Sequence, residues 1–304
     1  MSRVSIVAML LAAEVLIVGM AIYTVAGGGA TFAAGLHRSE FSAEPIAPVD
    51  AGNAPHVVVD DPDSRVRVAL SSDRLVHVRD FTQIRGWIFS SAKYPNLAVS
   101  RTDDGVRIER PGAPSDVALF GFSTQAIEIQ VPQGAQLEIA RCSGADVTGI
   151  SGGVNVHSVD GHVTLTDLTG SVDARSDDGY LDATNVRGDR LALDSMDGHI
   201  ALQDVAVASL SATTRDGRIV ADELSVSASG TLQTGDGSVR VRFAPDANVT
   251  IDASTRDGTI SVDGNSDRSD DSSQRTIRLG AGSGQMKLAT GDGSIRIFTN
   301  GELQ

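Results

Sequence analysis

Residues 154–165 read VNVHSVDGHVTL, and the Asp-Gly pair at the centre of this stretch marks a unit that recurs along the chain. The first six copies are 18 to 21 residues apart, and the seventh follows 35 residues later. Every copy fits the pattern [S/T]-x-D-G-x-[V/I/L], so the sequence predicts a structural repeat of about 19 residues. The seven pairs are Asp160-Gly161, Asp178-Gly179, Asp197-Gly198, Asp216-Gly217, Asp236-Gly237, Asp257-Gly258 and Asp292-Gly293.

Apolar residues alternate with polar ones on both sides of each Asp-Gly pair. Val154 and Val156 precede the first pair, and Val163 and Leu165 follow it. A period of two predicts strands with one buried face. The Asp-Gly pair predicts a turn, because both residues tolerate a positive φ. The alternation also places a hydroxyl residue, two before each Asp, on the inner face, where it needs a partner such as a turn amide. These residues are Ser158, Ser176, Ser195, Thr214, Thr234, Thr255 and Thr290.

Two all-β topologies fit such a repeat. In a β-solenoid each unit of about 19 residues is one coil, and equivalent residues stack on the next coil. In an antiparallel β-meander each Asp-Gly pair closes a hairpin. Near-identical copies at a nearly fixed period favour the solenoid, because stacked units need matching residues at matching positions.

The segments that flank the repeats are less regular. Residues 56–140 are rich in β-branched residues and are predicted to be a divergent β part that caps the repeats. The strand repeats are predicted for residues 141–300, with a polar insertion at 264–275 that reads GNSDRSDDSSQR. Residues 27–55, rich in Gly, Ala, Pro and Ser, are predicted to form a flexible linker.

Residues 4–26 are predicted to be a transmembrane anchor. As a helix they measure about 34 Å, enough for a hydrocarbon core of about 30 Å. The positive-inside rule leaves residues 1–3 as a cytoplasmic tail and places the C-terminal domain outside the cell membrane. The alternative is a cleaved signal peptide and a secreted domain, although such apolar regions are usually shorter. Glu14 interrupts the segment and is either a contact to a membrane partner protein or a tolerated polar residue.

Composition and motifs argue against several classes of function. The net charge of −14, with no basic block to offset it, disfavours nucleic-acid binding. Cys142 is the only cysteine, so no intramolecular disulfide or thiolate metal cluster can form. A calcium ladder of the repeated Asp residues is not favoured, because calcium β-rolls use nine-residue repeats.

No catalytic, cofactor-binding or metal-binding residues are predicted. A β-helix glycosidase or lyase would need paired carboxylates with a basic or His partner in a groove, and no such set can be assembled from the sequence. His162 and His199 follow equivalent turns and are expected in one row. The other copies carry unrelated residues there, which indicates a solvent-facing position.

One family resemblance emerges from these motifs. The segment VPQGAQLEIARCSGADVTGISGGVNVHSVDG at 131–161, with LQTGDGSVRV and DASTRDGTISV further on, is similar to the "putative adhesin" family of bacterial β-strand-repeat domains of unknown function. The resemblance covers roughly residues 56–300 and implies a β-solenoid-like fold, an envelope location and no catalytic residues.

The predicted function is therefore a membrane-anchored, non-enzymatic binding, adhesion or structural module of the cell envelope. Its expected partners are the lipid bilayer, through residues 4–26, and an envelope or surface ligand that the sequence does not name. The alternative is an accessory of envelope-stress signalling that acts through a membrane partner protein. A carbohydrate-active β-helix enzyme is the least favoured reading.

Overall fold

The computed structural model describes residues 39–40, 46–89, 97–111, 117–263 and 273–299. The predicted tail at 1–3, the predicted anchor at 4–26 with Glu14, and most of the predicted linker lie outside these ranges. Every regular element within the ranges is a β-strand. The described residues contain no helix with the length and hydropathy that a membrane span requires.

The chain divides into two compact units. The described part of the first comprises strand β1 (Ser39–Glu40), residues 84–89 of β5 (Leu75–Phe89) and residues 117–123 of β8 (Val117–Val131). The second unit contains the other described residues, including all seven Asp-Gly pairs.

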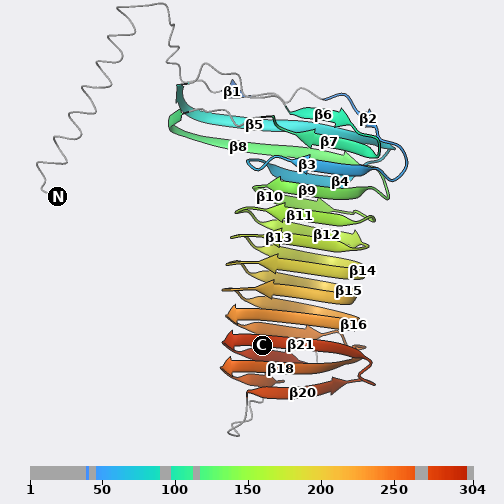
Figure 1. Cartoon of the computed structure of the whole chain (residues 1–304), viewed down its shortest axis with the longest axis vertical. Helices are drawn as coiled ribbons and strands as arrows, with labels where there is room; N and C mark the ends of the chain where they lie inside the picture. Colours follow the sequence, from blue (N-terminus) through green and yellow to red (C-terminus); the bar gives the residue numbers. More distant parts are fainter. Residues whose placement is uncertain (1–38, 41–45, 90–96, 112–116, 264–272, 300–304) are drawn as a thin grey trace, which may run out of the picture. The chain divides into compact units, whose positions relative to one another are not determined.

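Consecutive repeats in the middle of the chain stack in parallel (Figure 1). Leu181 lies between Val163 and Ile200, and Ile200 lies in turn beside Ile219. The solenoid prediction is therefore confirmed for these coils, and the hairpin meander is wrong for them. The strands are β11 (Val154–Ser158), β12 (Val163–Thr169), β13 (Val172–Ser176), β14 (Leu181–Ser195), β15 (Ile200–Thr214) and β16 (Ile219–Asp236).

The core is a set of apolar columns that run from coil to coil. In the coil that begins at Val163, the side chains of Leu165, Leu168 and Ala174 are fully buried. Each coil covers the apolar face of the next, which is why a unit too small to fold alone becomes stable in a stack.

The Asp-Gly pairs do form turns, but the expected reason is wrong. None of the seven glycines has a positive φ. Glycine is needed there because of close packing: a Cβ would lie only 1.6 to 2.0 Å from a carbonyl oxygen of the neighbouring coil. The left-handed conformation occurs instead at the other corner of the coil, at Asp167, Asn185, Asp204 and Glu223.

At the C-terminal end, the order of coils in space differs from the order in sequence. Strand β21 lies between β16 and β18 and is parallel to both, so that Leu288 is beside Leu232 on one side and Ala253 on the other. Strand β22 likewise lies between β17 and β19. The last repeat of the sequence therefore occupies the penultimate position of the stack. The strands are β17 (Val239–Phe243), β18 (Val249–Asp257), β19 (Ile260–Val262), β21 (Gly284–Asp292) and β22 (Ile295–Phe298).

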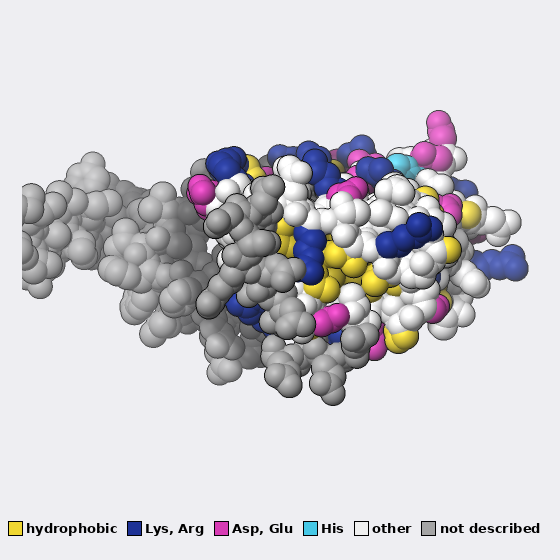
Figure 2. Space-filling view, turned by 90° about the horizontal axis from the view of Figure 1, so that it is seen from below, with side chains coloured by type: hydrophobic (Ala, Val, Ile, Leu, Met, Phe, Trp, Pro, Cys, Tyr) yellow, Lys and Arg dark blue, Asp and Glu magenta, His cyan; other side chains and the backbone are white. Residues whose placement is uncertain are grey.

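Strand β20 (Gln274–Leu279) closes this end by pairing antiparallel with β18. Gln274 and Arg275 belong to this strand, so the predicted insertion at 264–275 is too long at its end; residues 264–272 lie outside the described ranges. Ile277 and Leu279 are partly buried against the core. Figure 2, seen from below, shows apolar side chains in the middle of this end with basic and acidic ones around them.

The N-terminal end repeats this arrangement. Strand β3 lies between β7 and β9, with Val57 beside both Val106 and Leu137. Strand β4 lies between β8 and β10, and β6 pairs antiparallel with β7. The predicted β cap at 56–140 therefore consists of further coils. The strands are β3 (His56–Asp60), β4 (Arg65–Leu70), β6 (Ala98–Arg101), β7 (Gly105–Glu109), β9 (Gln136–Cys142) and β10 (Gly144–Thr148).

The described end of the predicted linker is also attached to this part. Strand β2 (Val49–Asp50) pairs antiparallel with β5, and Val49 lies opposite Val76. Ile46, Val49 and Ala51 pack against the core. At residues 46–55 the structure therefore departs from the expected flexible linker, because three apolar side chains lie against a buried surface there.

Candidate functional site

The seven hydroxyl residues before the Asp-Gly pairs are buried, with at most 6% of each residue exposed. The Ser195 Oγ accepts a hydrogen bond from the Gly198 amide at 3.0 Å and donates one to the Gly179 carbonyl of the neighbouring coil at 3.1 Å. The expected bonds to turn amides are present at all three serines. The four threonines instead donate across to a glycine carbonyl of the neighbouring coil. These bonds join Thr214 to Gly198, Thr234 to Gly217, Thr255 to Gly293 and Thr290 to Gly237.

This ladder gives the Asp-Gly pairs a structural role. The hydroxyls tie each turn to its neighbour, and the glycines allow the turns to approach closely. The seven aspartates that accompany them are all exposed. Among the described residues, no three His, Cys, Asp or Glu side chains are grouped so that they could hold a metal ion.

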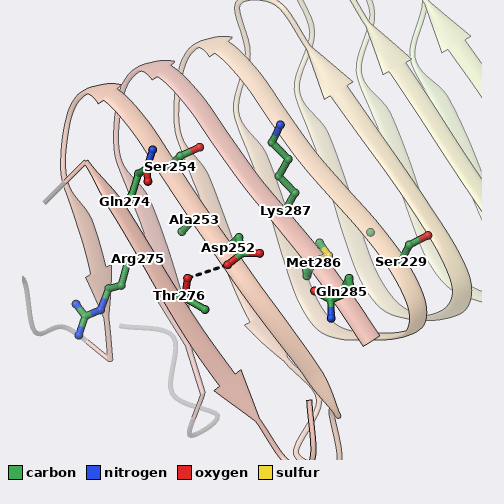
Figure 3. A pocket seen from close by; sticks show the side chains of 11 residues that line it. Ser229, Asp252, Ala253, Ser254, Gln274, Arg275, Thr276, Gln285, Met286 and Lys287 are labelled. Carbon is green, nitrogen blue, oxygen red and sulfur yellow. Dashed lines mark hydrogen bonds between the residues drawn. The ribbon is translucent and has the colours of Figure 1, made fainter. Parts of the chain in front are cut away.

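A shallow hollow of about 570 Å³ lies on the outer side of β16, β21, β18 and β20 (Figure 3). Its lining is mostly polar, and the Asp252 carboxylate accepts a hydrogen bond from the Thr276 hydroxyl at 2.8 Å. Asp252 is the one carboxylate in this lining, which contains no histidine. The paired carboxylates that a glycosidase uses are therefore missing from this lining.

A second surface follows from the residues that come directly after each Asp-Gly pair, here called the post-turn row. The backbone carbonyl of each member after the first accepts a hydrogen bond from the residue that directly follows a row member in the neighbouring coil, so the members lie side by side from coil to coil. The Tyr180 ring stacks on His199 at 5.3 Å between centroids and meets His162 edge-on at 5.9 Å. Tyr180 is 51% exposed, so this end of the row presents aromatic rings to solvent. In spatial order the row is His162, Tyr180, His199, Arg218, Ser238, Ser294 and Thr259.

Three members of the post-turn row, Arg218, Ser238 and Ser294, line a basic hollow of about 230 Å³, here called the arginine hollow. Three arginines line it: one directly before β16, one on β17 and one on β22. Arg240 and Arg296 are direct neighbours in the register of β17 and β22. The lining consists of Arg218, Val220, Ser238, Val239, Arg240, Ser294 and Arg296.

A family model described as Toastrack DUF4097 matches residues 64–298 of the chain. The chain belongs to the Toastrack DUF4097 family. The match confirms the resemblance to β-strand-repeat domains of unknown function. Among curated proteins, none matches the chain.

Two solved structures are similar to this Toastrack chain. One is described as a "putative cell adhesion protein" from Clostridium sporogenes; it is 12% identical, with 84% of this chain and 99% of that chain covered and a TM-score of 0.27. The other is described as a "putative adhesin" from Bacteroides fragilis; it is 13% identical, with 86% of this chain and 100% of that chain covered and a TM-score of 0.35.

Sequence reasoning placed His162 and His199 in one row, and the structure confirms this placement. It missed the arginine hollow, because Arg240 and Arg296 are 56 residues apart and belong to coils that are not consecutive in sequence. The available signal was the outward position of each arginine in its strand, since Arg240 and Arg296 both come three residues after a glycine of an Asp-Gly pair. That signal gives the face of each residue and not its neighbour.

Proposed function

We propose that this Toastrack chain is a non-enzymatic binding module of the bacterial cell envelope, and that it binds its partner through the outer face that carries the post-turn row. The observation that carries the proposal is the contrast between this row and the rest of the repeat. The hydroxyls and glycines of each turn are committed to holding the coils together, whereas the aromatic rings of the row and the Arg218 side chain lie on the outer face. A long, rigid, stacked surface is the form in which repeat proteins present binding residues.

The envelope location rests on the sequence. Residues 4–26 are long enough to span a bilayer, and the charge of Arg3 favours an outward C-terminal domain. A module held in this way acts by attachment, and a regular β-stack needs no moving parts for it. Adhesion to a surface polymer or to another envelope component is the activity that such an arrangement supports best.

Binding by the full chain in lipid nanodiscs tests the proposal. The chain is immobilised and exposed to a panel of neutral and acidic polysaccharides and of purified cell-wall fractions. We expect saturable binding to at least one member, and we expect Tyr180→Ala to weaken it by removing the exposed ring between the two histidines. The matched control is Asp173→Ala, an exposed position on β13 outside the post-turn row.

Two results would contradict the proposal. The first is an absence of binding across the whole panel. The second is binding that Tyr180→Ala and Asp173→Ala change equally, because the face of the post-turn row would then have no special part in it.

A further inference from the structure

The arginine hollow concentrates positive charge on a protein whose net charge is −14. Arg218 and Arg296 are exposed and Arg240 is half-buried. Among the described residues, no carboxylate forms a salt bridge with any of these three guanidinium groups. The neighbouring Arg242 differs, because it is paired with Asp222. Three guanidinium groups are therefore left to face one hollow.

The hollow has the donors that an oxyanion requires. A guanidinium group presents paired N–H donors that match carboxylate, sulfate and phosphate oxygens. Ser238 and Ser294 add hydroxyl groups to the lining. The Arg240 guanidinium lies 5.9 Å from the centroid of the Phe298 ring, which favours a fixed position for this cation.

The surroundings indicate what carries the anion. The post-turn row continues from Arg218 to His199, Tyr180 and His162, so aromatic rings extend from the basic hollow along the same face. The hollow itself has only two apolar residues in its lining, Val220 and Val239, and therefore lacks the apolar pocket that anchors a protein partner. An extended polar chain with acidic groups fits both the rings and the arginines.

We propose that the arginine hollow binds the acidic groups of an anionic polysaccharide whose chain runs along the post-turn row. This inference rests on the proposed binding function and specifies its ligand. Since the chain as a whole carries a net charge of −14, attraction is confined to short range, within a screening length of about 8 Å at physiological salt. A long nucleic acid would meet repulsion over most of its length and is the disfavoured polyanion.

The test uses the full chain in nanodiscs with four probes: dextran sulfate, polygalacturonate, neutral dextran and single-stranded DNA. The variant is Arg240→Gln/Arg296→Gln. The matched control is Arg175→Gln/Arg190→Gln, which changes the net charge equally at two exposed positions outside the hollow. We expect the acidic polysaccharides to bind, the hollow variant to bind them about tenfold or more weakly, and the control to bind within about twofold of the natural chain. A third variant, Arg240→Lys/Arg296→Lys, keeps the charge without the paired donors and is expected to restore binding only in part.

Three results would overturn the inference. If the hollow variant and the control lose binding equally, net charge alone is responsible. If DNA binds more tightly than the acidic polysaccharides, the ligand class is wrong. If only neutral dextran binds, or another member of the wider panel binds independently of the arginines, the inference fails while the proposed binding function stands. Thermal unfolding monitored by circular dichroism verifies that each variant is folded.

Discussion

The middle coils and the two ends of the stack are built from the same unit but are ordered differently. From Val163 to residue 236, each coil lies beside the next coil in the sequence. At the N-terminal end, β3 and β4 lie between strands that come later in the sequence. At the C-terminal end, β21 and β22 lie between strands that come earlier in the sequence. The comparison teaches that a repeat pattern specifies what can stack, whereas the connections between units decide which units become neighbours.

Both ends also carry an antiparallel strand, β6 on β7 and β20 on β18. A parallel stack exposes unpaired N–H and C=O groups on its last strand, and such an edge invites pairing with other chains. An antiparallel strand with polar residues covers that edge without extending the repeat. The middle coils need no such device, because each has a neighbour on both sides.

The largest expected effect concerns the N-terminal end. Arg110 donates hydrogen bonds to Asp61 at 2.8 Å and to Asp80 at 3.0 Å, and only 4% of its side chain is exposed. Burial alone would lower the pKa of Arg110, but the bonds to Asp80 and Asp61 outweigh it and raise the pKa. Arg110→Ala leaves the buried Asp61 without this partner, so we expect the free energy of unfolding to fall by about 3–5 kcal/mol. Urea unfolding measures it.

The control for Arg110 is Arg107→Ala. Arg107 pairs with Glu109 at 3.6 Å, and both side chains are 45% exposed. The change should cost at most about 1 kcal/mol. Equal losses for the two variants would contradict the view that the buried ion group holds this end together.

The next effect tests the close approach of turns in the middle coils. A Cβ on Gly198 would lie 1.8 Å from the Gly179 carbonyl oxygen, so the backbone of Gly198→Ala must shift. We expect a loss of about 1–3 kcal/mol in the free energy of unfolding. Gly153→Ala is the control, because its Cβ would meet nothing closer than the Ser171 carbonyl oxygen at 4.0 Å. A Gly198 variant as stable as this control would show that the turns are not closely packed.

A smaller effect is expected for the hydroxyl ladder. Ser195→Ala removes one bond to the Gly198 amide of its own turn and one to the Gly179 carbonyl of the neighbouring coil, and both glycines are buried. The expected cost is about 1–2 kcal/mol, measured by chemical unfolding. The control is Ser211→Ala on the outer side of β15 in the neighbouring coil, where we expect a change within about 0.5 kcal/mol. Similar costs at both positions would argue against a structural role for the ladder.

The smallest expected effect is a dependence of stability on pH. It comes from an ion pair that joins β4, in the N-terminal inserted coil, to β10 in the repeats. The Arg65 guanidinium bonds to Asp146 at 2.6 and 2.9 Å. Burial alone would raise the pKa of Asp146, but the bonds from Arg65 outweigh it and lower the pKa. A lowered pKa in the folded state adds stability above the ordinary Asp value of about 3.9, and this contribution disappears as the pH falls through the lower folded value.

Because both side chains of this pair are about one-third exposed, we expect the contribution to be below about 1 kcal/mol. Unfolding at pH 6 and pH 3 measures it, with Asp146→Asn as the comparison. The natural chain should lose more stability than the variant on acidification. An equal loss would contradict the assignment.

Much of the fold follows from the sequence because the repeat fixes it locally. The alternation around Val154 and Val163 predicts the strands, and the position of Ser195 predicts a buried hydroxyl. The reason for glycine in the turns could not be predicted, because it depends on the distance to a neighbouring coil. The arginine hollow could not be predicted either, since Arg240 and Arg296 meet only through the inserted last repeat.

The order of coils at the C-terminal end can be tested directly by disulfide cross-linking of three outward-facing positions. Ala289 lies beside Gln233 on one side and beside Ser254 on the other, so neighbouring Cα atoms are about 4.8 Å apart. Gln233 and Ser254 are then two strands apart, about 10 Å, which exceeds the span of a disulfide. Cys142 should not interfere, because it is fully buried and burial raises the pKa of its thiol.

Mild oxidation of three double-cysteine variants, followed by peptide mass mapping, gives the answer. We predict an intramolecular disulfide in Gln233→Cys/Ala289→Cys and in Ala289→Cys/Ser254→Cys, and none in Gln233→Cys/Ser254→Cys. A disulfide in the third variant, with none in the first, would show that the coils stack in sequence order and would contradict the inserted last repeat.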